Sequence, residues 1–274
     1  MGKLANLIKR NIKQISSGGW LDSETRIAFV HVPKCGGTSL KLAIRNTFNP
    51  LAQIPGVKSA YLSHDSAHVA SEVLGEDYRD YCENLLPYFL ANNRYRFVSG
   101  HWGLRDSVYH RFHESWDFIL LLRNPENRFL SNYWFNRVKA DEHFRIQSDL
   151  NEFLKSDRAT NYGRAFLRYL VPDSFRWNDA PSDELVEQAC ENLGRFKVVF
   201  ALEDLTAAKM SFKKAYGVTL NIPHVNTTRA LGKDRPEKPS SDQLDQIREI
   251  CRPDMAIYQA AIERIASENN TLET

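Results

Sequence analysis

A short and almost wholly apolar run, residues 117–122 (DFILLL), is the feature that most limits how this chain can fold. A run of this length without polar alternation is typical of a strand buried on both faces, as in a parallel sheet covered by helices. Similar runs occur at residues 26–32, 95–99 and 197–201, and longer helical patterns separate them. The alternation predicts an α/β fold with a central parallel sheet flanked by helices, in which the strands at 26–32 and 117–122 are central.

Helices are expected between and after these strands. They are predicted near residues 38–48, 66–91 with a break, 125–139, 158–170, 182–194 and 204–216, followed by a pair at 241–267 that Pro253 interrupts. Residues 221–240 hold three prolines and no apolar periodicity, which indicates a long surface connection rather than a linker between domains. The length of the chain suits a single α/β domain over residues 21–274.

Residues 1–20 stand apart because they hold four basic side chains, no acidic one, and apolar residues at helical spacing. This pattern predicts either an amphipathic helix on an anionic membrane surface or a basic terminus that packs on its own domain or frays. No run reaches the roughly 18 apolar residues of a membrane span, and no secretory signal is evident. We therefore expect a cytoplasmic protein whose candidate for peripheral membrane contact is this segment. The net charge of +2 is not the balance of a nucleic-acid-binding protein.

Neither cysteine nor histidine spacing predicts a metal. Four cysteines lie far apart and without CxxC spacing, which indicates reduced thiols: Cys35, Cys82, Cys190 and Cys251. His64 and His68 bracket Asp65 at helical spacing, which is compatible with a metal site. Two histidines without a clear third ligand are more typical of a polar helix start.

The first strand runs into residues 33–39 (PKCGGTS), after which a helical pattern begins. Gly36 and Gly37 allow positive φ, so that the free amides of the helix start can converge on an anion that the helix dipole also favours. Thr38 and Ser39 add hydroxyl donors, and Lys34 adds a charge. A nucleotide-triphosphate loop places its lysine after the glycines, whereas here the lysine precedes them. A plain tight turn is the alternative, but the combination favours a phosphate site.

A second phosphate site is predicted where the strand at 117–122 ends. Arg123 is followed by Asn124 as the N-cap and Pro125 as the first residue of a helix. Arg128 and Ser131 share one face of that helix with the cap. Arg123 and Ser131 are expected to hold a phosphate from two sides. Arg128 is expected either to join them or to pair with a carboxylate that fixes the helix.

These two segments carry a specific resemblance. Residues 32–39 (VPKCGGTS) resemble the 5′-phosphosulfate loop of the carbohydrate sulfotransferases that use 3′-phosphoadenosine 5′-phosphosulfate (PAPS), usually written PKTGGTS. Residues 123–133 (RNPENRFLSNY) resemble their 3′-phosphate motif, RDPxxRxxSxY, and the two motifs occur in the family's order. Cys35 replaces threonine or serine and Asn124 replaces aspartate. The likeness is closest to the heparan sulfate 2-O- and 6-O-sulfotransferases and covers roughly residues 26–230.

The resemblance implies a P-loop-like PAPS-binding α/β fold, with adenosine 3′,5′-bisphosphate as the product of the co-substrate. Residues 226–229 (NTTR) resemble a late segment near the nucleotide in the 6-O enzymes. The nucleotide contacts that follow from the two motifs and this segment are Lys34, Cys35, Gly36, Gly37, Thr38, Ser39, Arg123, Ser131, Asn226, Thr228 and Arg229. The acceptor implied by the family is a hydroxyl-bearing molecule, a glycan. No metal is expected.

His101 is the candidate general base. It follows the strand at 95–99, so it is expected at the carboxyl edge of the sheet, where α/β enzymes bind their ligands. A histidine can take a proton from an acceptor hydroxyl near neutral pH, while Lys34 stabilises charge on the leaving oxygen. A histidine at the corresponding place is the proposed base of the 2-O- and 6-O-sulfotransferases. The alternatives are a structural hydrogen bond at a strand end, or His64 or His68 as the base.

Several further residues are candidates for lining the acceptor cleft. Trp102 and Arg105 follow the proposed base, and His64 precedes it. Asn161, Tyr162 and Arg164 open a helix that resembles one bordering the cleft in the family, although amphipathic packing explains them equally well. Two other functions compete with sulfuryl transfer. One is a nucleotide-dependent, kinase-like phosphotransferase, and the other is a non-catalytic protein that binds glycans or membranes through its basic terminus and surface arginines.

Overall fold

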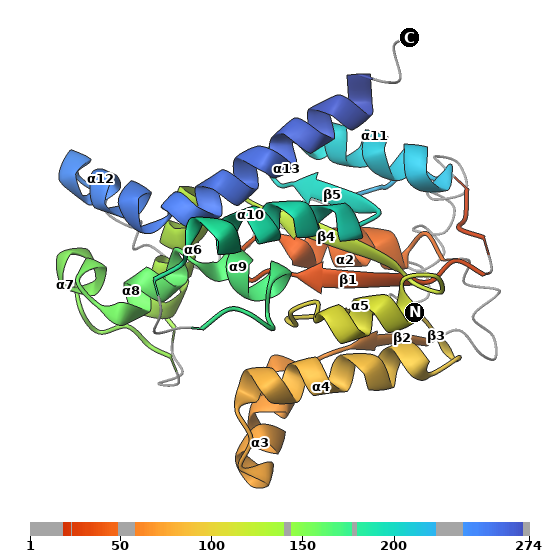
Figure 1. Cartoon of the computed structure of the whole chain (residues 1–274), viewed down its shortest axis with the longest axis horizontal. Coiled ribbons are helices and arrows are strands. Elements are labelled where there is room, and N and C mark those ends of the chain that lie inside the picture. The colour runs from red at the N-terminus through yellow and green to blue at the C-terminus, as the bar shows by residue number, and fades with distance from the viewer. Residues whose placement is uncertain are drawn as a thin grey trace, which may run out of the picture.

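The computed structural model describes residues 19–22, 24–48, 58–139, 144–176, 180–222 and 238–270. In this part of the chain five strands form one parallel sheet in the order β2-β3-β1-β4-β5 (Figure 1). The strands are β1 (Ile27–His31), β2 (Lys58–Tyr61), β3 (Tyr95–Gly100), β4 (Asp117–Leu122) and β5 (Val198–Ala201). The predicted α/β class and parallel sheet are confirmed.

The two strands predicted to be central lie inside the sheet. β1 pairs with both β3 and β4, and β4 pairs with both β1 and β5. Every residue of β1 is buried, as are five of the six in β4. Because helices cover both faces, neither strand has a solvent side, which accounts for the absence of polar alternation in their sequences.

Helices surround the sheet. They are α2 (Gly37–Arg45), α3 (His64–Leu74), α4 (Tyr78–Ala91), α5 (Asp106–Phe112), α6 (Pro125–Arg137), α7 (Leu150–Leu154), α8 (Asp157–Tyr162), α9 (Ala165–Leu170), α10 (Asp183–Asn192), α11 (Leu205–Tyr216), α12 (Ser241–Ile250) and α13 (Arg252–Asn270), with one 3-10 turn, η1 (Leu193–Arg195). The connection from β1 through α2 to β2 runs one way across the sheet, and the later connections run the other way. Right-handed crossovers therefore place α2 on one face and α4, α5 and α10 on the other.

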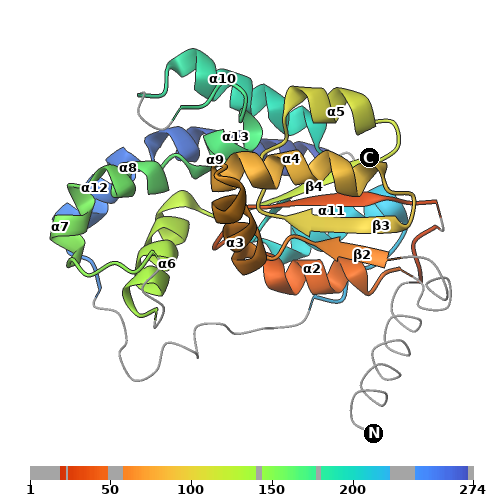
Figure 2. The same cartoon turned by 90° about the horizontal axis from the view of Figure 1, so that it is seen from below.

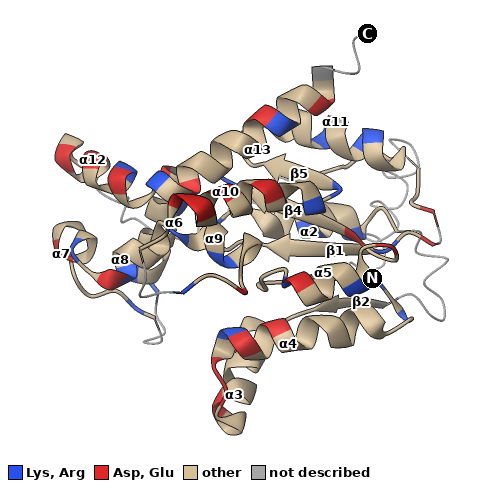
Figure 3. Ribbon diagram, in the orientation of Figure 1, with Lys and Arg blue, Asp and Glu red and all other residues tan. Residues whose placement is uncertain are grey.

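The helices lie over both faces of the sheet and beyond the carboxyl ends of its strands (Figures 1 and 2). Helices α4 and α5 lie together over one face, and α13 runs along β5 in contact with α10 and α11 (Figures 1 and 2). Helices α3, α6, α8 and α9 lie beyond the carboxyl ends of the strands, at the left of Figure 1. Helix α12 carries three acidic residues and one basic residue, and both colours appear on it in Figure 3. The carboxyl edge is thus the place where helices and strand ends can build a site.

Three short elements were not predicted: β2, α5 and α7. β2 is a four-residue edge strand of sequence KSAY, whose composition gives no apolar run. The helix expected over 158–170 is two short helices, α8 and α9, because Gly163 packs against Ile250 and the buried Asp254 accepts the Phe166 N–H at the start of α9. The break expected at Pro253 lies before it, since Pro253 is the second residue of α13, where a missing N–H costs little.

Within the described ranges, no helix has the combined length and apolar character of a membrane span. The basic segment predicted at residues 1–20 falls outside them except for its last two residues. Its two interpretations therefore stay predictions.

Candidate active site

Three adjacent strand ends build the candidate site. β1, β3 and β4 end at or just before His31, His101 and Arg123, and β1 lies between the other two. Their register aligns Val30 of β1 with Gly100 of β3, and His31 of β1 with Leu121 of β4. The loop that follows β1 is consequently flanked by His101 on one side and by Arg123 on the other.

The predicted phosphate loop has the geometry of an anion cradle. Gly36 has φ 79° and is the N-cap of α2, and Lys34 also has a positive φ of 67°. A Cβ on Gly37 would lie 2.2 Å from the His31 ring, and one on Gly36 would lie 2.8 Å from a methyl carbon of Leu202. The first turn of α2 contains no acidic residue, and its N-cap makes no side-chain hydrogen bond. The helix start therefore presents its amides without a competing side-chain acceptor.

Lys34 and Arg123 are fixed beside one another at this loop. The Arg123 Nη1 donates to the Lys34 carbonyl at 3.0 Å, and the Lys34 Nζ lies 3.6 Å from the centre of the Phe135 ring on α6. Burial, followed by the charge of Arg123, lowers the pKa of Lys34 to about 8. Two cations that follow neighbouring strands are thus held close to one another beside the loop.

Cys35, which lies within the same loop, has its side chain in the protein core. Its side chain is fully buried, and burial raises the pKa of its thiol to about 12. Its N–H donates to the Val32 carbonyl at 3.4 Å. The side chain is thus part of the core and the amide has a partner within the loop, while a nucleotide contact at Cys35 stays a prediction.

The helix start at the second predicted phosphate site has the expected form. Asn124 accepts a hydrogen bond from the Asn127 N–H at 3.1 Å, and Pro125 is the first residue of α6. Ser131 is half-buried on the same face of α6 as Phe135, four residues on. Because Phe135 contacts Lys34, this face of α6 is turned toward the phosphate loop.

Arg128 resolves the alternative that the sequence left open. Its side chain is 1% exposed, donates to the Tyr162 carbonyl and lies 3.5 Å from a carboxylate oxygen of Asp254. Burial raises the pKa of Asp254 to about 7, against the opposing effects of Arg128 and of backbone N–H groups at the start of α9. Arg128 pairs with a carboxylate and joins α6 to α8 and α13.

His101 is held in a defined chemical form. Its Nδ1 lies 2.5 Å from the His31 carbonyl oxygen, which can only accept a hydrogen bond. Nδ1 must therefore carry the hydrogen, and Nε2 is left as the basic nitrogen. Burial, helped by electrostatic repulsion from His64, Arg168 and Lys41, lowers the pKa of His101 to about 4, although the hydrogen bond to the His31 carbonyl acts in the opposite direction. The ring is neutral at pH 7 and able to accept a proton.

His64 and His68 lie next to this edge but pack on each other. The Leu62 N–H donates to the Ser99 carbonyl at 3.1 Å, which brings the start of α3 to the end of β3. The two imidazole centroids are 4.9 Å apart, and His68 stacks on Tyr78 at 4.1 Å. Among the described residues, no group of three His, Cys, Asp or Glu side chains is arranged to hold a metal ion.

A comparison with protein families gives this geometry its chemical setting. The family model described as "Sulfotransferase family" matches residues 19–260, which is most of the chain and includes every site residue named above. This chain belongs to the sulfotransferase family. A search of curated proteins found no match. Family membership makes the chain a transferase that moves a sulfuryl group to an acceptor with a hydroxyl.

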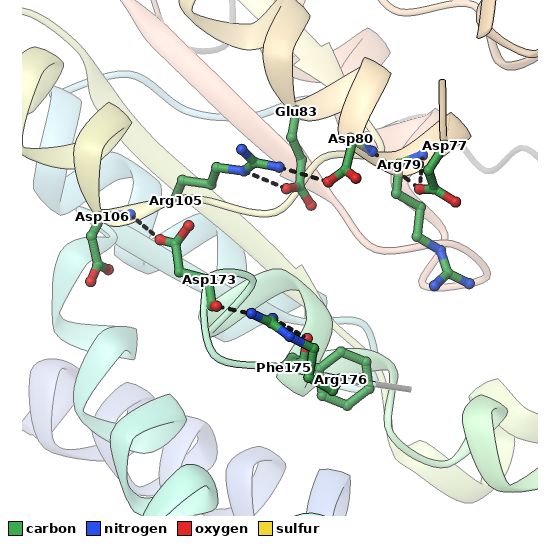
Figure 4. A network of polar contacts seen from close by, with 9 residues as sticks. All are labelled: Asp77, Arg79, Asp80, Glu83, Arg105, Asp106, Asp173, Phe175 and Arg176. Carbon is green, nitrogen blue, oxygen red and sulfur yellow. Dashed lines mark hydrogen bonds and ion pairs between the residues drawn. The ribbon is translucent and has the colours of Figure 1, made fainter. Parts of the chain in front are cut away.

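Two of the residues expected to line the acceptor cleft of the sulfotransferase, Trp102 and Arg105, make contacts within the fold instead. Trp102 has no exposed surface and packs 6.3 Å from Phe89, because the ring turns back under Gly100 into the core. Arg105 donates to Glu83 at 2.7 Å and to Asp80 at 2.8 Å (Figure 4). Trp102 is therefore a core residue, and Arg105 fastens α4 to the segment that follows β3.

Asn161, Tyr162 and Arg164 do not open a helix. Asn161 and Tyr162 end α8, while Arg164 directly precedes α9. The Tyr162 hydroxyl accepts from Asn136 at 2.9 Å and from Arg158 at 3.1 Å, so it is used in packing. Asn161 and Arg164 are half-buried. The expected nucleotide contacts Asn226, Thr228 and Arg229 lie outside the described residues.

Three residues that the sequence did not single out belong to this region of the sulfotransferase: His31, Phe135 and Asp254. The sequence patterns place His31 within a predicted strand, and Phe135 and Asp254 within predicted helices. Two local features of the sequence could have indicated His31 and Phe135. His31 lies two residues before the glycine-rich loop, and Phe135 lies one helical turn after Ser131. The pairing of Asp254 with Arg128 joins positions 126 apart and left no local signal.

Proposed function

We propose that this sulfotransferase transfers the sulfuryl group of PAPS to a hydroxyl of a carbohydrate acceptor, with His101 as general base. The observation that carries the proposal is the strand-end arrangement. A glycine loop with Lys34 lies between Arg123 on one neighbouring strand and a neutral, oriented His101 on the other. The carbohydrate class of the acceptor rests on the resemblance of the two motifs alone.

The nucleotide end of the site suits a molecule with a phosphate at each end of its ribose. The cradle at Gly36 and Gly37 accepts the 5′-phosphosulfate at the start of α2, and Lys34 lies over the same region. Arg123 and Ser131 would hold the 3′-phosphate. A nucleoside triphosphate would leave this second group of donors unused, which favours PAPS over a kinase co-substrate.

The chemistry at the acceptor end follows from the form of His101. The acceptor oxygen attacks the sulfur in line with the bridging oxygen, and its proton passes to the Nε2 of His101. A new sulfur–oxygen bond forms on the acceptor, and the bond between sulfur and the 5′-phosphate oxygen breaks. Adenosine 3′,5′-bisphosphate leaves with the negative charge, which Lys34 and the α2 amides stabilise.

The first experiment tests nucleotide choice and reaction together. The protein is titrated with adenosine 3′,5′-bisphosphate and with ATP by calorimetry, and labelled PAPS is then incubated with glycans, lipids and phenols before mass spectrometry. We expect clear preference for the bisphosphate and sulfated glycans among the products. Equal affinity for ATP, or sulfation of phenols alone, would contradict the proposed co-substrate or acceptor class, respectively.

The second experiment tests the base. His101→Ala is expected to lower turnover about 10²–10⁴-fold while nucleotide affinity changes little. His113→Ala is the matched control, because His113 is exposed at the end of α5. If His101→Ala kept more than about a tenth of wild-type turnover, the base would have to be sought at His64 or His68.

A further inference from the structure

His31 is a buried histidine at the end of the central strand that the proposed reaction does not use. Its side chain is 8% exposed. Its ring stacks on Phe29 at 5.4 Å with an interplanar angle of 14°, and lies 4.5 Å from the ring of His101. His31 is buried whereas His101 is half-buried, so His31 is the inner of the two rings and packs against the outer one.

The other side of this ring touches the phosphate loop. Its Cδ2 and Nε2 atoms occupy the place where a Cβ of Gly37 would lie, only 2.2 Å from that position. Gly37 is the first residue of α2, whose amides form the anion cradle. The His31 ring thus contacts the phosphate loop on one side and the His101 ring on the other. Its thickness therefore sets the distance between the loop and His101.

The same residue also orients the base through its backbone. The His31 carbonyl accepts the hydrogen bond of His101 Nδ1, which leaves Nε2 as the nitrogen that can accept a proton. The Nδ1 of His31 itself has no hydrogen-bond partner among the described residues. Burial, followed by electrostatic coupling to His101 and Lys41, lowers the pKa of His31 well below its usual value. A neutral imidazole with an unpaired nitrogen acts here through its shape and not through its charge.

Resting on the proposed function, we propose that His31 is a positioning residue whose ring is a spacer between the sulfuryl-donor loop and the base. It fixes the distance over which the acceptor oxygen must fit, and it keeps water from the inner face of His101. The ring fits here because position 37 is a glycine, since a Cβ there would lie only 2.2 Å from it. In-line transfer depends strongly on such spacing.

Variants of different size at this position separate spacing from fold stability. His31→Ala removes the spacer, His31→Phe enlarges it, and His31→Asn keeps a small planar side chain. We expect turnover to fall about 10–100-fold in His31→Ala and His31→Phe, with nucleotide affinity within about threefold of wild type, and to be partly restored in His31→Asn. Thermal unfolding of each variant identifies the temperature at which all of them are folded.

The decisive readout is the protonation of His101, which a purely structural role would not change. Without the His31 ring, water reaches the base, so its pKa should rise from about 4 by about 1 unit or more toward the value of free histidine. His64 on α3, Lys41 on α2 and Arg168 on α9 also face His101 and are unchanged in the variant. In His31→Phe the site stays dry, so the pKa should stay low even though turnover falls.

Imidazole NMR measures this pKa without any acceptor, and the spectrum of His101→Ala assigns the signal. A raised His101 pKa in His31→Ala, together with an Nδ1–H tautomer in the wild type, supports the spacer. An unchanged pKa, an Nε2–H tautomer, or turnover within about threefold of wild type in both His31→Ala and His31→Phe would overturn it. If the wild type transfers no sulfuryl group from PAPS, the proposed function fails, and the NMR result still decides the role of His31.

Discussion

The ring of Phe135 covers the ammonium group of Lys34, and removing it should change how the enzyme responds to pH. The Nζ lies 3.6 Å from the ring centre, and Phe135 is 46% exposed. A cation over an aromatic ring gains about 0.5–1 kcal/mol at an exposed site, and one pKa unit corresponds to about 1.4 kcal/mol. Because the ring stabilises the charged form, Phe135→Leu should lower the pKa of Lys34 by a further ~0.4–0.7 units.

This shift is visible in the pH profile of kcat/KM for PAPS. Lys34 can hold the phosphosulfate only while it is protonated, and its pKa is already lowered to about 8. The alkaline decline of the wild-type profile should therefore lie near that pH, and the decline in Phe135→Leu should begin at lower pH. Below about pH 6 Lys34 is protonated in the wild type and in Phe135→Leu alike. The two profiles should therefore come together there, apart from a modest loss of affinity for PAPS in the variant.

Two control variants separate the effect of the aromatic ring over Lys34 from the general effect of replacing a phenylalanine. Phe135→Tyr keeps the aromatic face and should retain the wild-type profile. Phe144→Leu makes the same replacement at another exposed phenylalanine, whose ring lies near Arg158 and not near Lys34. An alkaline limb in Phe135→Leu that stayed within about 0.2 units of wild type, or an equal shift in Phe144→Leu, would refute the reasoning.

Three further variants test other parts of the site. Arg123→Ala removes a charged donor and should weaken adenosine 3′,5′-bisphosphate binding about 10–100-fold by calorimetry, whereas an unchanged affinity would remove Arg123 from the nucleotide site. Gly37→Ala forces a Cβ into the His31 ring and should cost about 1–3 kcal/mol in urea unfolding, while Gly194→Ala, with open space around it, should cost far less. Arg128→Ala strands a buried carboxylate and should cost about 3–5 kcal/mol, against less than about 1 kcal/mol for the exposed Arg248→Ala; similar losses would contradict the buried pairing.

The sequence was sufficient where the cause of a structure is local. The apolar runs predicted β1 and β4 because strands buried on both faces need no polar side. Asn124 and Pro125 predicted the start of α6, since a cap and a proline act within one turn. The glycine pair predicted the turn at the end of β1 for the same reason.

The sequence was insufficient where a side chain's direction depends on distant neighbours. Trp102 follows His101 directly, yet it turns into the core, and no local pattern distinguishes the two directions at a strand end. Whether Arg128 faces a phosphate or pairs with a carboxylate depends on the position of Asp254, which lies 126 residues further along the chain. His31 became visible only when the register of β1 and β3 placed its ring against that of His101.

The pairing of Arg128 with Asp254 also bears on the order in which this protein becomes active as it is synthesised. The first phosphate loop, its helix and the strand that carries His101 all come from the amino-terminal half of the chain. The start of α9 needs the carboxylate of Asp254, and that carboxylate also compensates the buried charge of Arg128 on α6. Until α13 has left the ribosome, Arg128 on α6 is therefore without its counter-ion. We therefore expect a nascent chain to form its sheet early and to complete the packing of α6 and α9 against α13 last, and in the interval the partly folded chain is prone to aggregation.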